Sequence, residues 1–437
     1  MATERQNAST SEALRLHRLY RGKMQTALKC PVRGPADFGF WYTPGVAEPC
    51  RAIKAAPDSV YDYTNKGNLV AVVSDGSRVL GLGDIGPEAG LPVMEGKSLL
   101  FKYLGGVDAV ALCLATRSAE DLVRAVEWLA PSFGGINLED IAQPKCFRVL
   151  EALRDRLPIP IWHDDQQGTA TVVLAGLLNA LRATGRTLGN ARIAMIGIGA
   201  ANVATYRLLA AYGVQPGAIV ACDRGGILHP GRGDLDASQS AFPEKWCICR
   251  ESNADCRTGG IAEALAGADV CLAFSTPGPG IIQPDWIARM APRGIVFACA
   301  NPVPEIWPQE AHAAGAAIVA TGRGDFPNQV NNSLVFPGMF RGVLDVRSRA
   351  ITDDMAVAAA TALADYGVEL GLRPDRILPG MDDPQTAIRV AVAAAMAAQQ
   401  QGVAQVTRSR EEVAAMADRA IRAAQAASAA VAGQATL

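Results

Sequence analysis

The chain has 437 residues, enough for two or three domains with sizeable hydrophobic cores. Its 41 basic and 43 acidic residues nearly cancel, so the charge points to neither nucleic acid nor an anionic membrane as a partner. The sequence shows no signal-peptide pattern and no apolar run that would span a bilayer, and we therefore expect a cytoplasmic protein.

The N-terminal part predicts one helix and one loop of interest. Apolar residues recur at helical spacing over residues 11–29, and Pro31 should stop that helix. A loop rich in glycine and proline follows, in which Tyr42 comes just before a turn at Pro44-Gly45. The ring of Tyr42 either covers the core or presents its hydroxyl to a cleft, and the sequence leaves both interpretations open.

The next segment predicts a β-hairpin and an unusual lysine. Residues 69–74 and 78–82 have the pattern of strands on either side of Asp75-Gly76, a typical hairpin turn. Lys97 then falls in the predicted first turn of a helix, where the positive end of the helix dipole disfavours a cation. That position, or burial, would lower the pKa of Lys97 and suit it as a base; the alternative is a solvated surface lysine.

From Val107 onward, strands and helices alternate, which predicts a parallel sheet. The strand at 136–138 ends in Glu139-Asp140, and the strand at 159–162 is followed by Asp164-Asp165. Because parallel strands share one carboxyl edge, we expect both acidic pairs to emerge there, where ligands bind in open α/β sheets.

Two acidic pairs at one edge repel each other unless a cation lies between them. Mg²⁺ and Mn²⁺ fit this position because they prefer carboxylate oxygens. The alternative is that one pair faces solvent while the other caps a helix. A zinc site is not favoured, because the group Cys247, Cys249 and Cys256 lacks a well-placed fourth ligand.

A second run of alternation carries a nucleotide-binding motif. A strand at 191–196 is followed by Gly-Ile-Gly-Ala-Ala-Asn and a helix, which is a dinucleotide-binding fingerprint with Asn202 in place of the third glycine. Asp223 ends the next strand, where an acid binds the ribose 2′-hydroxyl of NAD. Arg224 beside it would instead pair with the 2′-phosphate of NADP, so the cofactor preference stays open.

The C-terminal part adds amides and helices. Asn301 and Asn331 follow strand ends, where they would bind a carboxylate or the nicotinamide amide, or simply form turns. Further strands are expected at 268–274, 294–300 and 317–320, and alanine-rich helices at 353–401 and 410–430.

Seven motifs link the chain to a known family. In chain order they are YTPGVAEPC, KGNLVAVVSDG with VLGLGDIGP, PVMEGK, FGGINLEDI, HDDQQGTA, CANPVPEIWP and DFPNQVNNSLVFPG. Over about residues 37–349 the chain therefore resembles the malic enzyme family, and in its length a compact bacterial member.

The resemblance implies a metal-dependent oxidative decarboxylase that converts L-malate to pyruvate and CO₂ and reduces NAD or NADP. It makes Lys97 the general base and Tyr42 the general acid, with Asp164 tuning Lys97. The implied Mn²⁺ or Mg²⁺ ligands are Glu139, Asp140 and Asp165. The implied malate contacts are Arg78, Asn301 and Asn331.

The expected fold class is α/β: an N-terminal substrate and metal domain (1–162), then a Rossmann-type doubly wound parallel sheet with C-terminal helices (163–437). The resemblance also implies a homodimer or higher oligomer, and it leaves open whether Tyr42 or Lys97 acts in a neighbouring subunit. The expected cofactor contacts are Thr169, Gly197, Gly199, Ala200, Ala201, Asn202, Asp223, Arg224 and Asn301.

Overall fold

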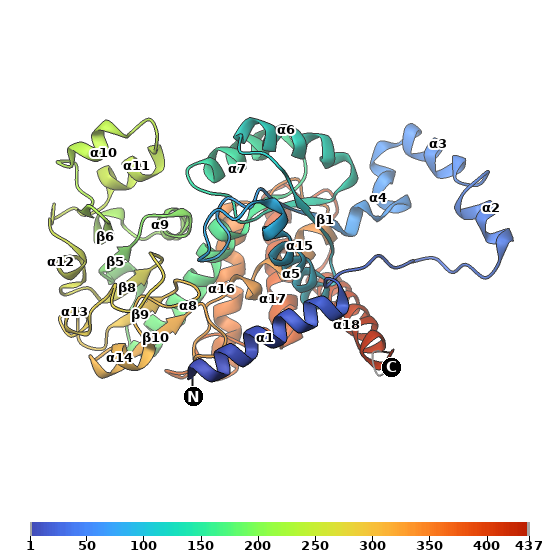
Figure 1. Cartoon of the computed structure of the whole chain (residues 1–437). Coiled ribbons are helices and arrows are strands. Elements are labelled where there is room, and N and C mark those ends of the chain that lie inside the picture. The colour runs from blue at the N-terminus through green and yellow to red at the C-terminus, as the bar shows by residue number, and fades with distance from the viewer. Residues whose placement is uncertain (1, 435–437) are drawn as a thin grey trace.

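The computed structural model describes residues 2–434 and contains two β-sheets surrounded by helices (Figure 1). The first sheet has four parallel strands in the order β2-β1-β3-β4. The buried side chains of β1, β3 and β4 are typical of a parallel sheet covered on both faces, whereas β2 lies at an edge and is partly exposed. The strands are β1 (Leu69–Ser74), β2 (Asp108–Cys113), β3 (Gly135–Leu138) and β4 (Ile161–His163), and the helices between them are α5 (Pro87–Gly105), α6 (Ala119–Leu129) and α7 (Lys145–Arg156).

The predicted hairpin after β1 is wrong. Residues 78–82 form no strand, and Val79 makes only one isolated bridge, with Gly83. The reason lies in the sheet: β1 pairs with β2 on one side and with β3 on the other, both in parallel. No edge of β1 remains for an antiparallel partner, so the turn at Gly76 leads into a loop.

Two predicted helix boundaries also change. Helix α1 (Ala2–Tyr20) ends well before residue 29, because Arg21 and Gly22 have positive φ angles of 53° and 112°. Helix α5 begins at Pro87, so Lys97 lies in the middle of this helix and not in its first turn. The argument from the helix dipole therefore does not apply to Lys97.

The second sheet has six strands in the order β10-β9-β8-β5-β6-β7, and all its neighbours are parallel except the β6–β7 pair. This confirms the expected Rossmann-type sheet. Its strands are β5 (Ile193–Ile196), β6 (Ile219–Asp223), β7 (Gly226–Ile227), β8 (Val270–Ala273), β9 (Ile295–Ala298) and β10 (Ile318–Thr321), and its helices are α9 (Ala200–Tyr212), α10 (Gly233–Ala237), α11 (Pro243–Glu251), α12 (Ile261–Leu265), α13 (Pro284–Ile287) and α14 (Pro308–Ala313).

Long helices join the two sheets into one body. Helix α8 runs from the edge of the first sheet toward the second, and one continuous apolar core extends across both (Figure 1). The C-terminal helices pack back onto α5, α8 and one another. Within residues 2–434, no helix combines the length and apolarity needed to cross a membrane. The helix that joins the two sheets is α8 (Thr169–Thr184), and the C-terminal helices are α15 (Phe336–Asp345), α16 (Asp353–Glu369), α17 (Pro384–Gln400) and α18 (Arg410–Gln434).

The segment before β1 behaves differently from the rest. Its short helices α2 (Phe38–Trp41), α3 (Ala47–Ala55) and α4 (Val60–Tyr63) extend away from the body as an arm (Figure 1). None of the three contains a buried residue. The arm therefore draws little of its stability from the core of its own chain.

The close packing of α15 on α17 gives a stability prediction. A Cβ added at Gly342 would lie 2.2 Å from the backbone oxygen of Ala391 in α17, so Gly342→Ala forces the two helices apart. We expect a loss of about 1–3 kcal/mol in the free energy of unfolding, measured with urea. Gly96→Ala in α5 is the control, because no atom lies within 4 Å of its added Cβ. It should gain about 0.5–1 kcal/mol, and equal effects at both positions would contradict the packing argument.

Candidate functional site

A large cavity lies between the carboxyl ends of the two sheets. Its volume is about 1590 Å³. Clefts of about 300–1,000 Å³ hold drug-sized ligands, so this one has room for a dinucleotide and a small acid together. One wall comes from α5 and the loops after β3 and β4, and the other from the loops after β5, β6, β8 and β9.

Lys97 lies on α5, in the first wall of the cavity. Its ammonium group lies 2.6 Å from Asp164 Oδ2 and 3.0 Å from Glu139 Oε1, and the side chains of all three residues are almost fully buried. Burial lowers the pKa of Lys97, but the carboxylates of Asp164 and Glu139 outweigh it, so the net pKa is raised. The expected lowering is therefore not found in this arrangement, and Lys97 is a protonated ammonium here.

The carboxylate of Asp164 is fixed from both sides. Oδ2 accepts the bond from Lys97, while Oδ1 accepts one from Trp162 Nε1 at 3.0 Å. Asp164 lies on a π-helical turn that runs to Gly168 before α8 begins. A Cβ at Gly168 would lie only 2.0 Å from Asp164 Oδ1, so a glycine is required for this close approach. The sequence HDDQQG thus shapes one rigid partner for Lys97.

Asp140 and Asp165 lie in contact at one sheet edge, as the strand order predicts, and Glu139 pairs with Lys97 at the same edge. The backbone N–H of Asp140 donates to Asp165 Oδ2 at 2.8 Å. Asp140 has a φ of 53°, an unusual angle for a residue other than glycine, and such strain persists only where neighbouring contacts hold it. One of these contacts is the bond from Arg78 N to the backbone oxygen of Asp140, at 3.1 Å.

These acids fit a divalent cation. Burial and the repulsion from Asp165 raise the pKa of Asp140 to about 8, and burial also raises that of Glu139. Asp140 Oδ2 is buried and has no hydrogen-bond partner among the described residues. A dication would relieve both the repulsion and the unpaired oxygen. Within residues 2–434, however, no three His, Cys, Asp or Glu side chains converge closely enough to surround an ion as they stand.

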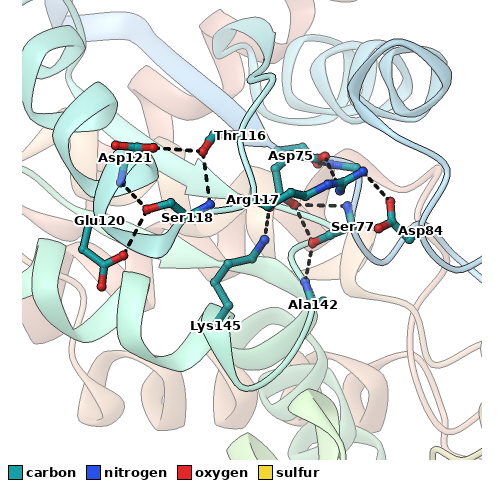
Figure 2. Close-up of polar contacts among 12 residues, drawn as sticks. Asp75, Ser77, Asp84, Thr116, Arg117, Ser118, Glu120, Asp121, Ala142 and Lys145 are labelled. Atoms are coloured by element: carbon teal, nitrogen blue, oxygen red, sulfur yellow. Dashed lines mark hydrogen bonds and ion pairs between the residues drawn. The ribbon is translucent and has the colours of Figure 1, made fainter.

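A second polar network holds the loop that carries Asp140 (Figure 2). Asp75 is fully buried, and its Oδ1 accepts from Ser77 N at 3.1 Å and from Ser77 Oγ at 2.6 Å. Its Oδ2 pairs with Lys145 at the start of α7. Ser77 Oγ in turn accepts from Ala142 N at 2.9 Å. The loops after β1 and β3 are therefore tied together at Ala142, two residues after Asp140.

The second wall has the form of a nucleotide site. Gly197 has a φ of 85°, and a Cβ there would lie 2.6 Å from Phe274 O, so the tight turn requires glycine. Asn202 does not line the cavity: its side-chain amide donates to Gly197 O at 2.7 Å and to two further backbone oxygens. Asn202 thus stabilises the turn through hydrogen bonds to its backbone. The other expected cofactor contacts all line the cavity, namely Thr169, Gly197, Gly199, Ala200, Ala201, Asp223, Arg224 and Asn301.

The predicted malate contacts line the cavity, whereas the predicted acid does not. Arg78, Asn301 and Asn331 line the same cavity as Lys97. Asn331 Oδ1 is already used to cap a turn at Ser333 N, at 2.9 Å. Tyr42 lies on the arm, does not line the cavity, and is 70% exposed. The structure therefore does not bring Tyr42 together with Lys97 in one chain.

Sequence reasoning missed several polar residues of the cavity. Arg232 and Lys245 reach it from the segment after β7, far from any recognised motif. Gln143 and Ser275 also line it. His163 does not line the cavity; it is fully buried, and neither of its ring nitrogens has a hydrogen-bond partner among the described residues. Of these residues, only His163 has a signal in the sequence, which is its adjacency to Asp164 and Asp165.

Family models, related sequences and a solved structure all match this chain over most of its length. The family model of the malic enzyme N-terminal domain matches residues 21–154, and that of the malic enzyme NAD binding domain matches residues 166–400. A bifunctional malic/malolactic enzyme of Bacillus subtilis is 46% identical over 405 residues, which cover 92% of this chain and 96% of that protein. An NAD-dependent malic enzyme of Geobacillus stearothermophilus is 45% identical over 383 residues, which cover 88% and 78%. The crystal structure of Entamoeba histolytica malic enzyme matches with a TM-score of 0.94 at 46% identity, and the match covers 98% of this chain and 89% of that one.

The network behind Asp140 gives a prediction for Ser77. Ser77→Ala removes the hydroxyl that joins Asp75 to Ala142, so the strained loop of Asp140 should loosen. We expect the affinity for Mn²⁺ to fall about 10-fold or more, followed through the electron paramagnetic resonance signal of the free ion. NADH binding on the other wall should not change.

Ser118→Ala is the matched control in the same region (Figure 2). The Ser118 hydroxyl caps α6 at Asp121 N and donates to Glu120, both on α6 and away from the acidic loop. Its loss should cost about 1 kcal/mol of stability and leave Mn²⁺ binding intact. Wild-type Mn²⁺ affinity in Ser77→Ala would refute the positioning role.

Proposed function

The chain belongs to the malic enzyme family, and on that premise we propose that it oxidatively decarboxylates L-malate to pyruvate and CO₂, reduces NAD(P), and depends on Mn²⁺ or Mg²⁺. The observation that supports this most directly is the place of Lys97, which lies between two carboxylates in a cavity whose opposite wall is the dinucleotide fingerprint. A base would thus reach the hydroxyl proton, and a hydride acceptor the hydrogen on carbon, of one substrate alcohol group.

Lys97 acts in this proposal as the general base that takes the C2 hydroxyl proton of malate. In the absence of a cation, its carboxylate neighbours hold its proton too firmly for that role. Lys97 loses part of this negative field once Glu139 and Asp165 are engaged by a dication, and its pKa then moves down toward the working range of a base. Asp164, fixed by Trp162, keeps the amine aimed into the cavity.

The residues that would hold the dication are Glu139, Asp140 and Asp165. When bound, the dication supplies polarisation of the substrate oxygen and stabilisation of the enolate charge, and the nicotinamide supplies the hydride acceptor. Arg78, Asn301 and Asn331 orient the two malate carboxylates at the junction of the walls. After oxidation at C2, the carboxylate on C3 is the one lost, because it is β to the new carbonyl, which takes up the electron pair as an enolate.

Tyr42 is the proposed acid that protonates C3 of the enol, and it has to reach the cavity from a second subunit. It sits on the arm beside Phe38, Phe40 and Trp41, and each of these aromatic residues is more than half exposed. Such a cluster is more apolar than a protein normally leaves in water. We propose a homodimer in which the arm packs on the second copy, so that Tyr42 protonates the enol in the cavity of its partner.

The base assignment is tested with Lys97→Ala. Removal of a general base should reduce kcat by about 10²–10⁴-fold in malate-dependent NAD(P) reduction with Mn²⁺. Lys102→Ala, further along α5 and paired with Asp108, is the control and should retain activity. Undiminished turnover in Lys97→Ala would sink the assignment. Joint formation of pyruvate and CO₂ by the wild type separates this function from a plain 2-hydroxy-acid dehydrogenase and from a decarboxylase of oxaloacetate.

The shared site is tested with a hybrid dimer. Tyr42→Phe and Lys97→Ala subunits, each inactive as homodimers, are co-expressed with different tags and purified as the hybrid. If Tyr42 acts across the interface, one of the two cavities regains both residues and about half the wild-type activity returns. A hybrid as inactive as its parents would place Tyr42 in its own subunit, and a monomeric mass in solution would exclude the exchange altogether.

A further inference from the structure

Asp223, which ends β6, already has hydrogen-bond partners on both carboxylate oxygens and is not free to bind a ligand. Asp223 Oδ1 accepts from Arg232 Nη1 at 2.6 Å and from Gly225 N at 2.8 Å, and its Oδ2 pairs with Lys245 Nζ. Burial alone would raise the pKa of Asp223, but the bonds from Arg232 and Lys245 more than offset it, so the pKa is lowered. Asp223 is thus a carboxylate whose charge is already balanced by two cations of its own chain.

The donors of Arg232 are taken up within its own chain, and Asp223 is one of its partners. Its guanidinium also donates to Asp234 through Nε at 2.9 Å and through Nη2, and to Gly226 O at 3.1 Å. The side chain is 10% exposed. Because Nε, Nη1 and Nη2 of Arg232 all donate within the chain, this side chain has little left to offer a ligand.

Lys245 and Arg224 are the cations that remain available. Lys245 reaches the cavity from α11, its side chain is 22% exposed, and an ammonium has three donors of which Asp223 takes one. Arg224 is exposed on the cavity wall, and its side chain makes no hydrogen bond or ion pair with the part of the chain that the structure describes. Two cationic side chains with open donors therefore line the cavity together with Asp223, which the sequence assigned to the adenosine ribose.

We infer that this corner binds the 2′-phosphate of NADP through Lys245 and Arg224, and that Asp223 does not select NAD. The inference rests on the proposed function in that it takes the fingerprint wall as the cofactor site. Arg224, Arg232 and Lys245 outweigh Asp223 and Asp234 by one positive charge, whereas a phosphate monoester carries about −1.5 to −2 at pH 7. The repulsion that a free Asp223 would exert on that phosphate is cancelled, so NADP is preferred over NAD.

Lys245→Met tests this, because it keeps the length of the side chain and removes the charge. We expect the ratio of kcat/KM with NADP to kcat/KM with NAD to fall about 10-fold or more, as for the loss of one hydrogen bond to a charged group. Lys245→Arg should keep most of the ratio. Arg250→Ala, an exposed position on the same helix α11, is the control and should not change it.

Binding separates this inference from the proposed reaction. The dissociation constants of NADPH and NADH are measured by energy transfer from tryptophan, without malate, and 2′,5′-ADP is compared with 5′-AMP as a competitor. Tighter binding of NADPH and 2′,5′-ADP, lost in Lys245→Met, supports the phosphate site even if malate is not turned over. The inference is overturned if the wild type binds NADH more tightly than NADPH, or if Lys245→Met leaves the ratio unchanged.

Discussion

The site depends on one constraint: parallel strands deliver four carboxylates to a single sheet edge, and a buried lysine offsets part of their charge. β3 and β4 pair in register, so Glu139-Asp140 and Asp164-Asp165 emerge side by side. Burying such charges is expensive unless each has a partner. Lys97 pairs with two of these carboxylates from the middle of α5, and the bond from Trp162 fixes one of them.

The surrounding loops are organised by the same need. Asp140 has a strained backbone and is held by hydrogen bonds with Arg78 and Asp165, while the network of Asp75 and Ser77 holds the same loop at Ala142. The acids are held near one another, but among the described residues they do not close into a coordination sphere. A site of this kind keeps its charges close and lets a ligand complete the balance, which is typical of ion-dependent active sites.

Strand periodicity and motif spacing predicted most of the fold because they are local properties. Residues 136–138 and 193–196 lie in strands as expected, and Asp223 ends the strand that follows the nucleotide motif. The hairpin after β1 was wrong because local turn chemistry cannot show that both edges of a strand are already occupied. The pKa of Lys97 was misjudged for a similar reason, since its partner carboxylates lie 42 and 67 residues away in the chain.

The sequence by itself determined the class of fold, the edge at which the acids gather and the identity of the nucleotide turn, because each follows from spacing along the chain. Only the tertiary structure decided how these parts are used. It paired Asp164 with Lys97, surrounded Asp223 with Arg232 and Lys245, and placed Tyr42 at the end of α2, outside the lining of the cavity of its own chain. Charge balance depends on side chains brought together from distant segments, and spacing along the chain does not encode that.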